Sequence, residues 1–312
     1  MSLTGNPWDE LCEVLDPKGC RVTNLPARIW LFGGPCAVNT EDGCLSLRQS
    51  FSKACLLWPS ASTPLWMKAL EQPEHYPDWW AFSGYSDLLE FERDAAYLSS
   101  AIVLFSESPG ALAELGAFAI DETLLPRLIV VVDQKFVESA NQRSFLNLGP
   151  LKRIRDNKML CVIDSESSFS LSDDNVKITI DFITASLPTT HKTEAFLPNN
   201  PTHRLLLIAD IIDLLIVSKA DDLMCVLEHF KVSLPLEQLR KLLNLLQFFE
   251  LVLIQNRGHE MFLTAPRRSA ATWIDYTARH GRSAFERSKF KLSALDHVRG
   301  DTRRNLIYGR AE

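Results

Sequence analysis

The sequence predicts an α/β protein with a Rossmann-like (flavodoxin-like) parallel sheet in the N-terminal domain and an α-rich, winged-helix-like C-terminal domain. In the first half, short β-branched runs alternate with helical patterns, which is typical of a parallel sheet with helices on both faces. In the second half, three helical patterns precede two short strands around an Asn-Arg-Gly turn, which is the order of a winged helix. A length of 312 residues agrees with two domains.

Each element of the first half follows from its local pattern. The run "RIWLFGGPC" predicts a buried strand that ends in a double-glycine turn. The segment 175–187 is expected to be a helix, but its many β-branched residues make this assignment uncertain from the sequence alone. In chain order, we expect strands within 28–36, 101–105, 127–133 and 159–164 and helices within 43–58, 87–100, 110–118 and 175–187.

Composition then divides the chain. The segment 188–203 is polar and Pro-rich without an apolar period, as expected of a linker. Helical patterns within 204–218, 220–230 and 235–252 precede the hairpin within 251–265. We therefore expect an N-terminal domain at 1–187, a linker at 188–203, a winged-helix-like domain at 204–265 and a basic C-terminal extension at 266–312.

Charge and cysteine content exclude several classes of protein. The chain has 33 Lys and Arg against 39 Asp and Glu, so no global basic field attracts nucleic acid or an anionic membrane. Its seven cysteines form neither a Cys-x-x-Cys pair nor a zinc-ligand array. No segment reads as a signal peptide or a transmembrane helix. We expect a soluble cytoplasmic protein without a metal site.

The stretch "AIVLFSESPGALAELGAF" places an acid where a doubly wound sheet binds its ligands. Ser108 is a candidate N-cap after the strand, Pro109 suits the first helical position, and Gly110 permits close approach of a ligand. Glu114 falls in the second turn, and its side chain leans back toward the mouth of the site. The alternative is a solvent-facing acid stabilised by the helix dipole, although its neighbours are mostly small or apolar.

The segment "LFSESPGALAELGAF" resembles the strand, loop and helix of nucleoside deoxyribosyltransferase-like proteins, in which the Glu before Leu-Gly attacks the anomeric carbon. The resemblance is sharper for the effector proteins of bacterial retrons that carry this domain. "IWLFGG" is similar to their first strand and loop, and "RSFLNLGPLKRI" to a third segment of theirs. The resemblance implies that Glu114 is the nucleophile.

The same resemblance and the local residue types indicate further candidates. Glu92, which aligns with an acid of the retron effectors, could bind ribose hydroxyls or orient water, or it could lie on a solvated helix face. Asn147 could donate to the substrate or cap a turn. The double glycine could let backbone N–H groups of Gly33 and Gly34 face a phosphate or a ribose, or it could be a structural turn. The remaining candidates for substrate binding lie in the two loops at the strand ends: Phe32, Gly33, Gly34, Ser108, Pro109 and Gly110.

The resemblance to retron effectors implies a first hypothesis about function. The chain is expected to be a retron toxin in antiviral defence that cleaves the N-glycosidic bond of NAD, its substrate rather than a cofactor. By resemblance, its partners are a reverse transcriptase and its RNA–DNA product (msDNA), which restrain it in a higher-order assembly until phage infection; no membrane is involved. Transferases of this family usually have Asp where this chain has Ser108, which argues against ordinary deoxynucleoside exchange.

Two other functions remain open. One is a transferase or hydrolase that acts on other nucleosides or nucleotides. The other is a winged-helix DNA-binding regulator whose N-terminal domain only senses a nucleotide.

The C-terminal extension holds cations among aromatic residues. We expect Arg267, Arg268, Arg303 and Arg304 to face phosphates of the partner complex while the aromatic residues pack on protein. The alternative is a solvated helical extension.

Overall fold

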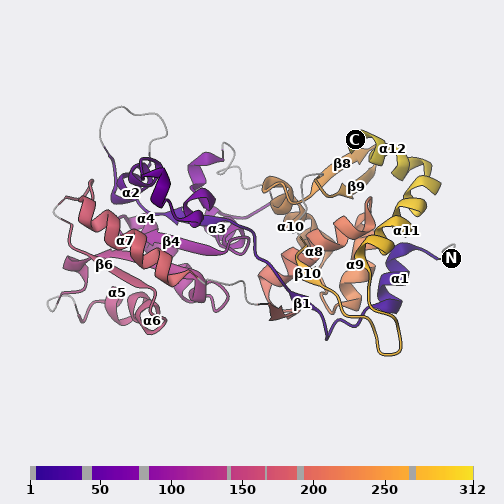
Figure 1. Cartoon of the computed structure of the whole chain (residues 1–312), viewed down its shortest axis with the longest axis horizontal. Coiled ribbons are helices and arrows are strands. Elements are labelled where there is room, and N and C mark those ends of the chain that lie inside the picture. The colour runs from indigo at the N-terminus through magenta and orange to yellow at the C-terminus, as the bar shows by residue number, and fades with distance from the viewer. Residues whose placement is uncertain are drawn as a thin grey trace. The chain divides into compact units, whose positions relative to one another are not determined.

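The computed structural model describes residues 5–36, 44–76, 84–138, 142–165, 167–187, 193–266 and 272–311. The chain forms two compact units. The sheet unit comprises Pro26–Phe82 and Ser86–Thr190, and the helical unit comprises Met1–Leu25, Ser83–Tyr85 and His191–Glu312 (Figure 1).

The sheet unit is built on five strands that all pair in parallel. Their spatial order is β3-β2-β4-β5-β6, which is 2-1-3-4-5 when counted along the chain, an order found in doubly wound sheets. Every residue of the three inner strands is buried, which explains their continuous apolar runs. The strands are β2 (Ile29–Phe32), β3 (Leu70–Glu71), β4 (Ala101–Phe105), β5 (Leu128–Asp133) and β6 (Leu160–Ile163).

Helices cover this sheet, and the predicted parallel sheet is confirmed. Phe51 of α2 and Ile180 of α7 share one core cluster with Val103 of β4. Phe118 of α4 packs instead on Phe32, with ring centroids 5.5 Å apart. The helices are α2 (Leu47–Leu56), α3 (Leu88–Ala96), α4 (Pro109–Ala119), α5 (Phe145–Leu148), α6 (Pro150–Asp156) and α7 (Asp173–Ser186).

The β-branched segment near 180 is helical, as expected. Ser172 caps α7 by accepting a hydrogen bond from the N–H of Asn175, and two acids follow in the first turn. One face of α7 is buried, including Val176 and Ile180. Packing therefore outweighs the weak helix propensity of its β-branched residues.

The helical unit holds the second half of the chain and the first 25 residues. Three helices precede an antiparallel hairpin that turns at Gly258, whose φ is 61°. This agrees with the element order expected from the sequence. The elements are α1 (Pro7–Val14), β1 (Arg21–Val22), β7 (Glu194–Ala195), α8 (Pro201–Leu215), α9 (Ala220–His229), α10 (Leu236–Phe248), β8 (Leu253–Arg257), β9 (Glu260–Thr264), β10 (Ile274–Asp275), α11 (Arg287–Gly300) and α12 (Thr302–Ala311).

A small antiparallel sheet changes the expected boundaries. Arg21 of β1 pairs with Ala195 of β7 on one side and with Asp275 of β10 on the other. The expected linker at 188–203 therefore contains a strand and the start of α8. The first 25 residues group with the helical unit, whereas the expected N-terminal domain at 1–187 included them.

The expected C-terminal extension is also part of the core of the helical unit. Trp273, Tyr276 and Phe290 are buried. The fully buried Asp210 of α8 accepts a hydrogen bond from the N–H of Trp273 at 2.9 Å and pairs with Arg287 of α11 at 2.8 Å. These three aromatic residues therefore pack on protein, as expected, and the protein that covers them is their own unit.

Two further observations concern membranes and cysteines. Within the ranges given above, no helix combines the length and the apolar content that crossing a bilayer requires. All seven cysteines are free thiols.

Candidate functional site

Glu114 is positioned by the junction of β4 and α4. Ser108 ends the strand connection and accepts a hydrogen bond from the N–H of Ala111 at 3.1 Å, so it is the N-cap that the sequence predicts. Pro109 occupies the first helical position. Leu115 is fully buried, while Glu114 beside it is half-buried. The second turn of α4 thus holds the carboxyl group at the carboxyl end of the parallel sheet.

The carboxyl group of Glu114 lies in a poorly solvated setting. Its Oε2 atom is buried and has no hydrogen-bond partner among the described residues. Burial raises the pKa of Glu114 to about 8, with further contributions from the charges of Glu92 and Glu74, while Arg48 opposes the rise. Glu92 of α3 is itself buried. The structure therefore brings the two predicted acids together, and the solvent-facing alternative for Glu92 is wrong.

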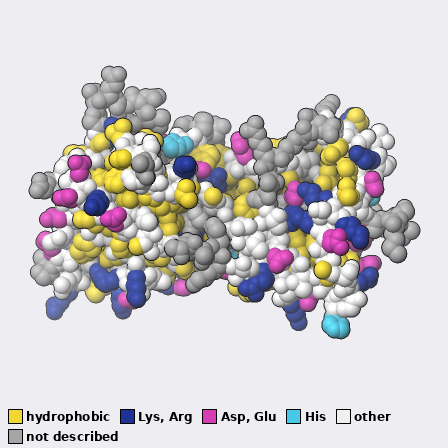
Figure 2. All heavy atoms as spheres, viewed as in Figure 1, with side chains coloured by type: hydrophobic (Ala, Val, Ile, Leu, Met, Phe, Trp, Pro, Cys, Tyr) yellow, Lys and Arg dark blue, Asp and Glu magenta, His cyan; other side chains and the backbone are white. Residues whose placement is uncertain are grey.

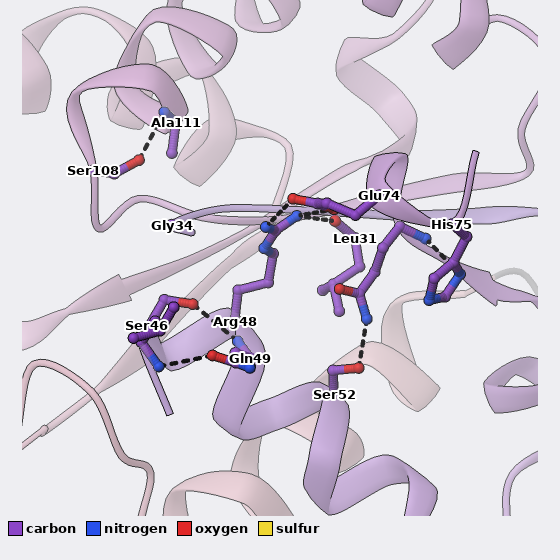
Figure 3. A network of polar contacts seen from close by, with 12 residues as sticks. Leu31, Gly34, Ser46, Arg48, Gln49, Ser52, Glu74, His75, Ser108 and Ala111 are labelled. Atoms are coloured by element: carbon purple, nitrogen blue, oxygen red, sulfur yellow. Dashed lines mark hydrogen bonds and ion pairs between the residues drawn. The ribbon is translucent and has the colours of Figure 1, made fainter. Parts of the chain in front are cut away.

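Arg48 and Glu74 were not predicted from the sequence. Arg48 of α2 is only 3% exposed and binds Glu74 through both terminal nitrogens, at 2.5 and 3.1 Å. One of these nitrogens also donates to the carbonyl of Leu31 at 3.3 Å, and Figure 3 shows Arg48 reaching from its helix toward Glu74. The sequence offered no clear signal, because the same helix also carries Lys53 and no local pattern distinguishes the buried cation from the other one.

Glu107 is a second carboxylate that sequence reasoning missed. It follows β4 and accepts hydrogen bonds from three backbone N–H groups, those of Gly34 at 2.9 Å, Leu47 at 2.5 Å and Arg48 at 2.9 Å. Its charge lies at the N-terminus of α2, where the helix dipole favours an anion. Glu107 thereby ties the loop after β2 to the first turn of α2.

This contact corrects the predicted role of the double glycine. Gly34 was expected to present its N–H to a phosphate or a ribose, but that N–H donates to Glu107. A Cβ atom at Gly33 would come within 2.8 Å of the Cβ of Arg48, and one at Gly34 within 2.8 Å of the Cβ of Ser46. The two glycines therefore allow the loop to pack closely against the start of α2.

Phe32 and Gly110 differ in their access to a ligand. Phe32 is 1% exposed and its ring packs on Phe118, so it supports the sheet and does not line the site. Gly110 is exposed, and a Cβ atom there would have only the Ser108 hydroxyl within 4 Å, at 3.9 Å. Close approach of a substrate to this turn stays a prediction.

Asn147 lies in α5 and is held by the protein itself. Its side-chain amide donates to the carbonyl of Phe136 and to the hydroxyl of Ser144, and its oxygen accepts from Arg155 at 3.4 Å. These contacts favour the structural alternative, in which Asn147 stabilises a turn. Contact of Asn147 with a substrate stays a prediction without support from this geometry.

The four arginines expected to bind a partner fall into three groups. Arg267 and Arg268 lie outside the described residues. Arg303 is 66% exposed and pairs with Glu260. Arg304 is 5% exposed, pairs with Asp222 at 2.8 Å and donates to the carbonyl of Val217 at 2.8 Å. Arg304 is therefore a structural residue, which corrects its assignment to partner binding.

The arrangement around Glu114 is suited to stabilising positive charge. The charges of Glu92, Arg48 and Glu74 all act on Glu114, and the buried guanidinium of Arg48 is paired with Glu74. In the part of the chain that the structure describes, no group of His, Cys, Asp or Glu is placed to hold a metal ion. A carboxylate at such a place can trap an electrophilic carbon or stabilise an oxocarbenium-like transition state.

Comparison with known proteins places the chain in a family. The family model of the STM3845 retron effector protein matches residues 45–254, which is more than half of the chain. The Retron Ec86 putative ribosyltransferase/DNA-binding protein of Escherichia coli is 34% identical over 156 residues, which cover 49% of this chain and 45% of that protein. The Retron Ec73 protein of the same description and organism is 41% identical over 68 residues, 22% of this chain and 21% of its own. The matches thus span less than half of the length of either relative. The family match includes Glu92, Glu114 and the helices α8, α9 and α10, and because it covers more than half of the sequence, the chain belongs to the STM3845 retron effector protein family.

Proposed function

We propose that this retron effector cleaves the N-glycosidic bond of NAD and releases nicotinamide, with Glu114 as the nucleophile. The observation that carries the proposal is the half-buried carboxyl group of Glu114 at the carboxyl end of the sheet, whose Oε2 atom has no described protein partner. The Ec86 relative is described as a putative ribosyltransferase, which supports chemistry at a ribosyl carbon.

The proposed reaction has two displacements at the same carbon. An oxygen of the Glu114 carboxylate forms a bond to C1′ of the ribosyl group while the bond from C1′ to the nicotinamide nitrogen breaks. The bonding pair leaves with that nitrogen, so the positively charged ring departs as neutral nicotinamide and needs no general acid. Water then attacks C1′ and releases the carboxylate, and in this proposal Glu92, whose charge acts on Glu114, accepts the proton that the water loses.

The negative charges near Glu114 favour this substrate over a neutral nucleoside. Glu74 and Glu92 both act electrostatically on the site, and Arg48 is already paired with Glu74. A substrate with a positively charged ring at the anomeric carbon gains from that field, whereas a neutral base does not.

The test is to incubate the purified protein with NAD and, separately, with deoxynucleosides and nucleotides, and to measure released nicotinamide or free base. Glu114→Gln is nearly isosteric but is a poor nucleophile, so we expect nicotinamide release to fall by at least about a thousandfold. Glu138→Gln is the matched control, because Glu138 is an exposed acid of the same unit. Release of free base from nucleotides but not nicotinamide from NAD would favour the other nucleotide-directed function.

The helical unit supports a binding role less directly. Its order of α8, α9, α10 and the β8–β9 hairpin suits the proposed winged-helix-like domain. The helix α10 carries two cations, Arg240 and Lys241, that could contact DNA phosphates. The Lys241 ammonium lies 4.1 Å from the ring centroid of Tyr85, so it already makes a cation–π contact within the protein. We therefore rank a DNA-binding regulator below the enzyme.

We further propose that the effector acts within its retron system, restrained by the reverse transcriptase and its RNA–DNA product in a higher-order assembly until phage infection. Membership of the retron effector family supports this association. Co-purification of the tagged effector with the reverse transcriptase, before and after nuclease treatment, tests whether the nucleic acid takes part.

A further inference from the structure

The segment from Arg143 to Lys158 is strongly basic although the whole protein is acidic. It carries five cations and one acid, Asp156, in a chain with 33 Lys and Arg against 39 Asp and Glu. Figure 2 shows Lys and Arg side chains gathered at the lower left, where Figure 1 places α5 and α6. The five cations are Arg143, Lys152, Arg153, Arg155 and Lys158.

Most of these cations are not neutralised by the protein. Arg153 pairs with Glu122. Within the described parts of the chain, Arg143, Lys152 and Lys158 have no ion-pair partner, and all three are exposed. An exposed cluster of unpaired cations raises the local potential and attracts anions despite the net charge of −6.

Apolar groups lie among these cations. Phe145 is 86% exposed and Leu148 is 62% exposed, both in the four-residue helix α5. A groove of about 570 Å³ beside them is lined by Lys152 and Arg155 together with apolar side chains that include Leu148 and Val162 of the edge strand β6. Exposed apolar groups that gather in one place, rather than singly, are typical of a binding surface.

We infer that this basic surface, made by α5, α6 and the edge of β6, binds a single-stranded nucleic acid, with the cations on phosphates and Phe145 stacked on an unpaired base. Cations that follow a backbone, combined with an aromatic ring for the bases, are the features by which proteins hold single strands without reading their sequence. The ring of Phe145 can stack only on a base that is free of its partner strand, so the surface favours single strands over a duplex. The inference is independent of the glycosidase reaction, because none of these residues is in the Glu114 site.

The geometry argues against an anionic membrane as the occupant. A membrane-bound helix needs a continuous apolar face, but α6 has only seven residues and buries its apolar side chains Leu151 and Ile154 in the protein. The exposed apolar groups are instead confined to α5 and the groove.

The test measures binding of a fluorescently labelled single-stranded oligodeoxynucleotide to the full chain by anisotropy over a salt series. We expect Arg143→Glu combined with Lys152→Glu to weaken binding at least tenfold. The slope of the logarithm of the association constant against the logarithm of the salt concentration should become shallower by about 1.4, because each of the two lost phosphate contacts contributes about 0.7. Lys68→Glu combined with Lys177→Glu is the matched control, because both are exposed lysines of the same unit and the change of net charge is equal.

Phe145→Ala tests the stacking contact separately. We expect it to weaken single-strand binding by about tenfold with an unchanged salt slope, whereas Phe169→Ala, at a 59% exposed ring of the same unit, has no such effect. Equal losses for the basic-surface variant and its lysine control would overturn the inference. The inference would also be overturned if the protein bound phosphatidylserine vesicles through Arg143 and Lys152 and did not bind the oligonucleotide.

Discussion

At the scale of single residues, the ionisation of Glu114 limits the proposed reaction, because only the carboxylate is a nucleophile. Burial raises the pKa of Glu114 to about 8, so most of the free protein holds this group neutral at pH 7. We expect kcat/KM for NAD to rise about tenfold per pH unit below pH 8 and to level off above it. The measurement is a pH–rate profile of nicotinamide release.

The control for this profile is Glu92→Gln. Removing the negative charge of Glu92 lowers the pKa of Glu114, so the rise should move to lower pH even if the plateau rate falls. A profile that is flat between pH 6 and 9 would contradict the assignment of Glu114 as the ionising nucleophile.

The same carboxyl group has a predictable effect on stability. Its ordinary pKa is 4.5 and its folded pKa is about 8, so between these values the folded protein holds a proton that the unfolded chain has released. The free energy of unfolding therefore falls as the pH rises from 4.5 through 8. Because Gln cannot ionise, Glu114→Gln should be more stable than the parent above pH 8, by about 5 kcal/mol at about 1.4 kcal/mol for each unit between the two pKa values, and nearly equal to it at pH 4.5.

Thermal unfolding of both proteins across this pH range is the measurement. Glu138→Gln serves as the control, since Glu138 is exposed and its loss leaves no buried charge behind. A Glu114→Gln variant whose relative stability does not depend on pH would show that Glu114 ionises normally in the folded protein.

Glu107 has a different role, because its carboxylate is satisfied by three backbone N–H groups. In Glu107→Gln one acceptor oxygen becomes an amide donor that faces other donors. We expect a loss of about 1–3 kcal/mol in the free energy of unfolding. The comparison by urea unfolding is again with Glu138→Gln, and equal stabilities of the two variants would mean that Glu107 does not hold this loop.

At the scale of elements, the site segment was predictable because its determinants are local. Ser108 and Pro109 mark the start of α4 in the sequence, and the apolar run before them marks β4. The small sheet was not predictable in this way. Each of its strands has only two residues, and β1 is held by partners near residues 195 and 275, so no local pattern distinguishes it from a loop.

The packing of α12 on the helical unit can be tested, because α12 carries two adjacent arginines of which one is buried and the other is exposed. Arg304 is 5% exposed against the buried Asp222, while Arg303 is 66% exposed. Arg304→Met leaves a buried carboxylate without its cation and should cost about 3–5 kcal/mol, whereas Arg303→Met should cost less than about 1 kcal/mol. Equal effects in urea unfolding would contradict the packing of α12 on its unit.

At the scale of the whole molecule, the sequence predicted the two kinds of architecture but not how the chain is divided between the units. Alternation of strands and helices predicts the sheet, because hydrophobic periodicity is a local property. In contrast, the contacts of Arg48 with Glu74 and of Glu107 with the loop after β2 depend on tertiary proximity. The sequence therefore indicated Glu114 and Glu92 as candidates, whose catalytic roles stay predictions, but it gave no sign of the buried charges of Arg48 and Glu107 around them.

The division into two units leads to a prediction about cooperativity. Each unit has its own buried cluster, around Val103 in the sheet unit and around Phe262 in the helical unit. Asp210→Ala removes the buried partner of Arg287 in the helical unit and should cost about 3–5 kcal/mol, whereas Glu107→Gln acts in the sheet unit. Because the two positions share no hydrogen-bond or ion-pair partner among the described residues, their effects should add within about 0.5 kcal/mol.

Calorimetry of the two single variants and the double variant measures these free energies of unfolding. We expect each change to shift the unfolding transition of its own unit. An interaction free energy above about 1 kcal/mol would show that the two positions are energetically coupled, and a single transition shifted by both changes would show that the two cores unfold as one cooperative structure.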